Sequence, residues 1–339
     1  MATKRIGKQT VKLQNPPSII ATACIVGPKE GEGPLRLYFD EIIDDELFGE
    51  KTWEKAESKL MRETFAKVLK KANKTAEDID YIIAGDLLNQ CLAANFRLRE
   101  SEVPFFGVYG ACSTMAESMS IGSMLVDGNF ADNVVCLTSS HFCSAEKQFR
   151  FPLELGTQRP PTAQWTVTGS GGVVISNKGN GPYITHITTG KIVDMGIKDV
   201  NNMGAAMAPA AMDTIVSHFM DTGFTPEDYD LIVTGDLGAV GKEICDELTR
   251  EQGYNISKVY NDCGLMIYDR QKQDTHAGGS GCGCSATVFA GFIYKKLLEG
   301  VINKVLFVAT GALLSTTSSQ QGESIPCIAH AVSISNTIS

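Results

Sequence analysis

One block of this sequence occurs twice, 150 residues apart, and this duplication restricts the possible folds more than any other feature. Residues 75–87 (Thr-Ala-Glu-Asp-Ile-Asp-Tyr-Ile-Ile-Ala-Gly-Asp-Leu) align without a gap with residues 225–237 (Thr-Pro-Glu-Asp-Tyr-Asp-Leu-Ile-Val-Thr-Gly-Asp-Leu). Each copy begins with a threonine and two acids, which suit a first helical turn because they cap free N–H groups and favour the positive end of the helix dipole. Each copy then runs into a short apolar strand that stops at Gly-Asp-Leu.

A second pair of blocks, 172 residues apart, extends the duplication. Gly110-Ala-Cys112-Ser-Thr opens a helical stretch that is followed by a strand over 134–138, and Gly283-Cys284-Ser-Ala opens another that is followed by a strand over 305–310. Strands that alternate with helices in this way predict an α/β fold. We expect one duplicated α/β body with halves at residues 1–182 and 183–339, and an insertion within 253–276 of the second half.

Charge and composition exclude several classes of protein. The chain has 339 residues and a net charge of −9, whereas a nucleic-acid surface needs clustered Lys and Arg. The longest apolar stretch, Val305–Leu314, is about half as long as a membrane span, so we expect a soluble protein. The basic N-terminus lacks the apolar segment of a secretory signal. The ten cysteines lack partners at metal-ligand spacing, so we expect reduced thiols and no metal site.

Further motifs carry a resemblance to a known family. The sequence Val108-Tyr-Gly-Ala-Cys112-Ser-Thr, in which a Cys ends a strand and starts a helix, resembles the thiolase and ketoacyl-synthase superfamily, as does the glycine-rich stretch 169–175. The resemblance implies a thiolase-like fold in which duplicated α/β halves form a five-layer αβαβα sandwich. Within the superfamily, residues 85–90, 149–152, 166–170, 207–211 and 277–282 are similar to the stage V sporulation protein AD family of endospore-forming bacteria. That family is tied to dipicolinic acid in the developing spore.

Cys112 is the position at which this resemblance points most directly to chemistry. At a helix N-terminus a thiolate faces unpaired N–H groups and the positive end of the dipole, so we expect a lowered pKa and residual nucleophilicity. The alternative is a small buried apolar residue, because free cysteines are among the most buried residue types. Cys284 occupies the equivalent helix start in the second half.

The expected partners for condensation chemistry are missing from the sequence. Condensing enzymes of the superfamily use His plus Asn, or two His, to stabilise an oxyanion by hydrogen bonds. The corresponding positions here carry Asp236 and the loop Gly279-Ser-Gly-Cys-Gly-Cys284. An ionised carboxylate accepts hydrogen bonds and repels an oxyanion, so Asp236 cannot take over this role. The departure argues against condensation and favours a pocket that has been put to another use.

A dianionic aromatic ligand such as dipicolinate needs donors for two carboxylates and a flat apolar slot. The proposed ligand-binding residues are Cys112, Asp86, His330, Asp236, Cys284 and Arg150. His330 begins the last strand, and Arg150 could bind a carboxylate with two hydrogen bonds, although a surface ion pair is the commoner arrangement. Asp86 stands at a strand end, where its alternative role is a turn and cap. The acids suit a dianion only if they are protonated, turned away or bridged by a cation, for which calcium is one choice.

The resemblance implies a protein that binds dipicolinic acid and aids its uptake into the forespore, without condensation and without a cofactor. It also implies a homodimer, association with the other proteins of the stage V sporulation A membrane transport system, and a place at the spore inner membrane through those partners. The alternative is an acyltransferase or 3-oxoacyl synthase that uses Cys112 on an acyl thioester. A third hypothesis is an assembly scaffold with a vestigial pocket.

Overall fold

The computed structural model describes residues 3–149 and 159–338. Two sets of five strands share one order and one pattern of directions. In each set two parallel pairings at one edge are followed by two antiparallel pairings. The first set is β5 (Phe105–Gly107), β4 (Tyr81–Gly85), β6 (Asn133–Ser140), β8 (Gly169–Ser176) and β2 (Ser18–Val26). The second set is β11 (Tyr260–Asp262), β10 (Leu231–Thr234), β13 (Lys304–Ala312), β14 (Cys327–Ser335) and β9 (Tyr183–Thr188).

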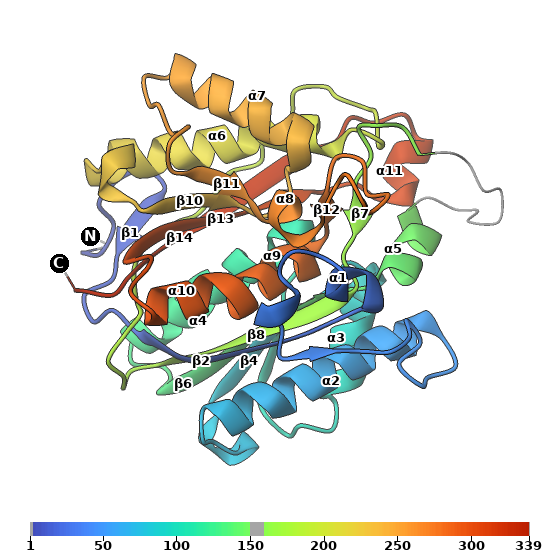
Figure 1. Ribbon diagram of the computed structural model, residues 1–339. Coiled ribbons are helices and arrows are strands. Elements are labelled where there is room, and N and C mark those ends of the chain that lie inside the picture. The colour runs from blue at the N-terminus through green and yellow to red at the C-terminus, as the bar shows by residue number, and fades with distance from the viewer. Residues whose placement is uncertain (1–2, 150–158, 339) are drawn as a thin grey trace.

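Helices lie between the two sets of strands and on both outer faces, which gives five layers (Figure 1). The central layer holds α4 (Thr114–Asp127), α9 (Cys282–Val288) and α10 (Tyr294–Leu298). Outside the first set lie α2 (Trp53–Lys71) and α3 (Leu92–Leu98), and outside the second lie α6 (Met203–Thr222) and α7 (Gly238–Glu251). The expected αβαβα sandwich of duplicated α/β halves is confirmed.

Short elements complete the chain. The strands β2 and β9 meet at Ser18 and Tyr183, so the two sets join edge to edge. Four short strands complete the set. The strand β1 (Thr10–Lys12) pairs with β9, and β3 (Glu41–Ile42) pairs with β2. The strands β7 (Trp165–Thr166) and β12 (Gly279–Ser280) form a separate parallel pair. The remaining α-helices are α1 (Pro28–Gly31), α5 (Phe142–Phe149), α8 (Cys263–Ile267) and α11 (Thr316–Gln320).

The duplicated sequence block forms the same local structure in both halves. Thr75 and Thr225 each begin a capping box, in which the threonine N–H donates to Asp78 and Asp228 respectively at 2.7 Å. One more acid in each copy links the turn to a neighbouring strand. Asp80 accepts a hydrogen bond from the N–H of Asn133 at 3.0 Å. Asp230, its counterpart in the second half, accepts from the N–H groups of Asn303 and Lys304. The caps and strands predicted from the repeat are therefore confirmed.

The additional chain of the second half lies mostly within residues 253–276, as predicted, and it follows the edge strand of the second set. The strand β11 lies inside residues 253–276, yet it occupies the position that β5 has in the first half. Most of the extra length is α8 and the loop that runs from it to β12. The insertion therefore follows the edge strand of the second set and passes close to the start of α9.

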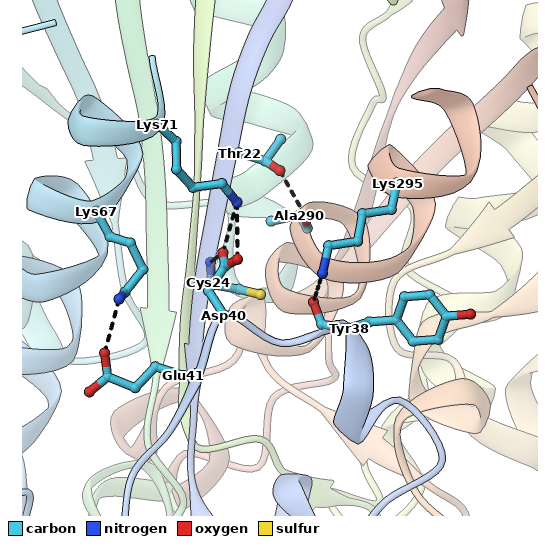
Figure 2. A network of polar contacts seen from close by, with 9 residues as sticks. All are labelled: Thr22, Cys24, Tyr38, Asp40, Glu41, Lys67, Lys71, Ala290 and Lys295. Carbon is cyan, nitrogen blue, oxygen red and sulfur yellow. Dashed lines mark hydrogen bonds and ion pairs between the residues drawn. The ribbon is translucent and has the colours of Figure 1, made fainter. Parts of the chain in front are cut away.

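A polar network fastens the loop around Asp40 to both halves (Figure 2). Asp40 accepts a hydrogen bond from the N–H of Cys24 at 3.0 Å and pairs with Lys71 of α2 at 3.0 Å. Lys295 of α10 donates to the carbonyl of Tyr38 at 2.6 Å. The segment therefore connects an outer helix of the first half with the central layer. Beside it, the carbonyl of Ala290, in the π-helical turn Phe289–Ile293, accepts from the hydroxyl of Thr22 at 2.8 Å.

Candidate functional site

A narrow cavity of about 50 Å³ lies where the carboxyl ends of strands from both halves meet. Leu87 follows β4, Ala312 ends β13, and Cys112 lies in the turn before α4. Carboxyl ends of strands are where α/β proteins usually place their sites. The lining residues are Leu87, Tyr109, Ala111, Cys112, Ala145, Glu146, Thr166, Val200, Met203, Ser280, Ala312 and Leu314.

Cys112 lies in a tight 3₁₀ turn, Ala111–Ser113, directly before α4. Ala111 has a φ of 51°, a left-handed conformation that is unfavourable for a residue with a Cβ and typical of functional turns. The side chain of Cys112 is only 8% exposed. The turn therefore holds the thiol against the cavity wall.

The pKa of Cys112 shifts in the direction opposite to the prediction. Burial raises the pKa of this thiol well above its usual range, and the neighbouring carboxyl of Asp236 raises it further. The thiol interacts with the carboxyl of Asp236, and this interaction disfavours the thiolate. The expectation of a helix-activated thiolate is therefore wrong, because desolvation and an adjacent acid outweigh the helix terminus.

Asp236 collects hydrogen bonds from several segments around the cavity. Its carboxylate accepts from Thr310 of β13 at 2.8 Å, from Ser280 of β12 at 3.2 Å and from the N–H of Gly281 at 2.9 Å. It is 1% exposed, and burial raises its pKa. The residue thus joins β10, β12 and β13 to the Cys112 turn, and it offers an oxyanion no hydrogen-bond donor while it is ionised.

The pairing of Cys112 with Asp236 makes a prediction about thiol reactivity. We expect Asp236→Asn to lower the pKa of Cys112, because the amide removes the negative charge that opposes a thiolate while keeping the shape of the side chain. Alkylation of Cys112 by iodoacetamide at pH 8 should become about tenfold faster or more, since thiolate content rises tenfold for each unit of pKa. Peptide mass spectrometry measures the rate, with half-buried Cys143 as the internal control. Unchanged labelling of Cys112 would contradict the assignment.

Asp86 forms hydrogen bonds within its own half. One carboxylate oxygen accepts from the N–H of Leu88 at 2.8 Å, and the other accepts from the N–H of Ala94, in the first turn of α3, at 2.8 Å. Asp86 is fully buried, and burial raises its pKa. The turn and cap considered for Asp86 is therefore present. A role in ligand binding stays a prediction.

A second buried carboxyl, Glu57 of α2, interacts with Asp86. Burial raises the pKa of Glu57, and the charge of Asp86 raises it further. Glu57 accepts hydrogen bonds from Ser139 at 3.1 Å and from Ser144 of α5 at 2.6 Å. Two acids that interact in a dry site cannot both be ionised cheaply, so the pair retains a proton. Glu57 anchors α5, which carries Ala145 and Glu146 to the cavity.

The two cysteines at the start of α9 have different environments. Cys282 packs in one cluster with Leu87, Ala111, Cys112 and Ala145, and its thiol donates to the carbonyl of Ser139 at 2.9 Å. Cys284 is buried in the main core, in the same cluster as Cys263. Cys282, which the sequence did not single out, is thus the residue of α9 beside Cys112, and Cys284 is not among the lining residues.

His330 and Arg150 are two of the predicted ligand-binding residues. His330 accepts a hydrogen bond from the N–H of Gly190 at 3.2 Å, and burial lowers its pKa to about 4, so the ring is neutral at neutral pH. It does not line the cavity. Arg150 lies outside the described residues. Arg159 stacks over Trp165 and donates to the carbonyls of Gln164 and Asp274.

The described lining of the cavity is mainly apolar. It contains one carboxyl, Glu146, and no Lys or Arg. In the part of the chain that the structure describes, no group of three or more His, Cys, Asp and Glu side chains could hold a metal ion. The described lining therefore offers apolar surface on which an aromatic ring can pack.

Comparison with known proteins decides the family. A model of the family described as stage V sporulation protein AD (SpoVAD) matches residues 7–335. The chain belongs to this family. The stage V sporulation protein AD of Bacillus subtilis (strain 168) is 49% identical over 329 residues, which are 97% of each chain. As a member of the stage V sporulation protein AD family, the chain carries the Cys112–Asp236 pair on a thiolase-like fold.

Several solved structures share this fold at low sequence identity. The 3-oxoacyl-[acyl-carrier-protein] synthase III of Aquifex aeolicus VF5 matches with a TM-score of 0.57 at 14% identity, over 94% of this chain and 99% of that one. AbyA1, a tetronic acid condensing enzyme, gives 0.59 at 13% identity over 94% and 99%. Cerulenin-bound OleA of Xanthomonas campestris gives 0.57 at 14% identity over 94% and 96%. These likenesses establish the fold. Among the described helices, none has the length and apolar character needed to cross a membrane.

Proposed function

We propose that this protein binds dipicolinic acid in the cavity beside Cys112 and aids its uptake into the forespore, without condensation chemistry. The observation that carries the proposal is the pairing of Cys112 with Asp236. A thiol beside a buried carboxyl is kept protonated, and the carboxyl while ionised cannot stabilise an oxyanion. The cavity lies at the carboxyl ends of strands from both halves, and family membership supplies the link to sporulation.

The buried carboxyl of Asp236 supports the calcium chelate as the bound species. Asp236 accepts a hydrogen bond from Ser280, which lines the cavity, and burying the two carboxylates of dipicolinate near it would bring like charges close together. A calcium ion bound by both carboxylates neutralises the charge of the ligand and prefers oxygen atoms as further ligands. The apolar residues Leu87, Val200 and Leu314 then offer surface to the aromatic ring.

Filling the cavity tests the proposal. Met203, the first residue of α6, lines the cavity, whereas Met220 near the end of the same helix is 72% exposed. We expect Met203→Trp to weaken dipicolinate binding at least tenfold, because the indole occupies the ligand's space. Met220→Trp should bind like the natural chain. Calorimetry with dipicolinate, with and without calcium, measures both. If the natural chain gives no binding heat both with calcium and without it, the proposed function is refuted.

The transport role places the protein with the other components of the stage V sporulation A membrane system, at the spore inner membrane. Family membership supports this part of the proposal. Cells that carry Met203→Trp should accumulate less spore dipicolinate than cells that carry Met220→Trp. Equal dipicolinate content in both strains would favour the scaffold hypothesis.

We also propose that two copies associate along β5. This strand ends the first set, and Phe106 on it is 47% exposed while Tyr109 beyond it is 42% exposed. An edge strand with exposed aromatic side chains is a surface that another chain can cover. Light scattering should show a dimer, and Phe106→Glu should give a monomer.

The alternative function is acyl transfer by Cys112. The strained turn at Ala111 and the fold shared with condensing enzymes favour it. In such a reaction the Cys112 sulfur attacks the carbonyl of a thioester, the thiol leaves with the proton, and the acyl group stays on the protein. Intact mass spectrometry after incubation with acetyl or malonyl thioesters tests this. A stable adduct that is lost in Cys112→Ala would support the enzyme.

A further inference from the structure

A groove between α2 and α3 concentrates positive charge on a chain whose net charge is −9. Its volume is about 590 Å³, and none of its lining residues belongs to the cavity beside Cys112. Two helices of the first half's outer layer form its walls (Figure 1). Five basic side chains line it, namely Lys55, Lys59, Arg62, Arg97 and Arg99. Three acids line it as well, namely Glu50, Glu54 and Glu100.

Arg97 of α3 is the most buried of these cations. Its side chain is 15% exposed, and its Nε is buried and makes no hydrogen bond within the described residues. The acid beside it is Glu100, whose carboxylate lies 3.9 Å from Nη1 and whose side chain is 68% exposed. A long contact to an exposed acid compensates a buried charge poorly. Arg97 is thus a largely buried cation with a weak counter-charge.

Arg62 of α2 increases this imbalance. Burial lowers the pKa of Arg97, and the positive charge of Arg62 lowers it further, while Glu100 and Glu63 act in the opposite direction. Arg62 is 42% exposed, and its Nε contacts Glu63 at 2.8 Å. Two guanidinium groups from neighbouring helices therefore repel each other across the groove. An anion between them would remove the repulsion.

Two of the three acids of the groove make ion pairs. Glu54 pairs with Lys147 of α5, which is not a lining residue, at 3.0 Å, and Glu100 lies 3.9 Å from the groove's own Arg97 and Arg99. Five basic and three acidic side chains leave the described lining with an excess of positive charge.

We propose that this groove binds a multiply charged oxyanion of the phosphate class, held by the guanidinium groups of Arg62 and Arg97. Arginine presents N–H groups in a planar fork that matches two oxygens of a phosphate, and such charged hydrogen bonds are among the strongest in proteins. The anion is either free phosphate or diphosphate, or a phosphate group carried by a larger molecule. The site is separate from the cavity proposed for dipicolinate.

Calorimetry with inorganic diphosphate on the full chain, in 150 mM salt, tests the proposal at an ionic strength that suppresses loose surface binding (about 8 Å screening length). We expect saturable binding that Arg97→Gln and Arg62→Gln each weaken at least tenfold. Arg250→Gln is the matched control, because Arg250 is an exposed arginine of α7 that contacts Glu247. It should bind like the natural chain. Arg62 is partly exposed, so its variant keeps the test valid if Arg97→Gln fails to fold.

Two outcomes would overturn the proposal: no saturable heat from the natural chain, or natural affinity in both groove variants. A parallel titration with glycerol phosphate distinguishes the sources of the ligand. Binding tighter than that of inorganic phosphate indicates a phosphate group on a larger molecule, and weaker binding indicates the free ion.

Discussion

Replacing Gly311 by Ala is expected to lower the free energy of unfolding by about 3 kcal/mol or more and to abolish dipicolinate binding. Gly311 lies in β13 next to Thr310, which donates to Asp236. A Cβ at this position would lie 2.2 Å from the carbonyl oxygen of Gly110 and 3.1 Å from the nitrogen of Ser113. Both atoms are backbone, so neither can move without shifting the turn that holds Cys112.

Gly107→Ala is the matched control for this change. Within its own chain, a Cβ at Gly107, in the edge strand β5, would meet nothing closer than 3.4 Å. An alanine there restricts the unfolded chain as much as one at Gly311, so the control corrects for a stabilisation of about 0.4–1 kcal/mol. Because β5 is also the proposed contact between two copies, urea denaturation compares the midpoints of the two variants and their parent in the monomeric Phe106→Glu background. Equal urea midpoints for Gly311→Ala and Gly107→Ala would show that β13 does not make a tight steric contact with the Cys112 turn.

The repeat made the fold predictable because each half repeats local interactions that depend on sequence alone. Thr75 and Thr225 cap turns with an acid three residues later, and this signal needs no tertiary information. The edge strand β11 was not predicted, because three residues that include Asn and Asp carry little strand signal. The strand β11 is defined by its hydrogen bonds to β10, and the local sequence does not encode this tertiary pairing.

The site was predictable in position and only partly in chemistry. The motif around Cys112 predicted where one wall of the cavity lies, because the strand, the turn and the helix that form it are consecutive in the chain. The pKa of Cys112 depends on Asp236, which is far away in sequence and reaches the thiol only after β10 and β13 pair. Cys282 and Cys284 differ by two positions on α9, and packing alone decides which one lies beside Cys112.

We expect the free energy of unfolding of the natural chain to fall as pH rises, and we expect Glu57→Gln to remove much of this decrease. Glu57 interacts with Asp86 in a buried site, and both carboxyls have raised pKa values for the same main reason, burial. A raised pKa means that the folded chain holds a proton that the unfolded chain releases near pH 4–5, the usual range of carboxyls. The stabilisation from this proton is therefore complete below that range and is lost as pH rises through the folded pKa.

Urea denaturation at pH 5, 7 and 9 measures the effect. We expect the natural chain to lose about 2 kcal/mol or more between pH 5 and pH 9 from this pair, because one unit of pKa corresponds to about 1.4 kcal/mol. The glutamine carries no titrating proton. Its oxygen can accept from one of Ser139 and Ser144, and its NH2 group can donate to the hydroxyl oxygen of the other. The decrease should therefore shrink by at least half, with Asp86 accounting for the remainder.

Glu54→Gln is the control on the same helix. The pKa of Glu54 is lowered by its own and neighbouring hydrogen bonds, with Lys147 contributing, although partial burial acts in the opposite direction. Its contribution is therefore constant above pH 5, and the variant should parallel the natural chain. If Glu57→Gln also parallels the natural chain, Glu57 is ionised in the folded protein. The proton of the pair would then have to reside on Asp86, whose carboxylate already accepts the N–H groups of Leu88 and Ala94.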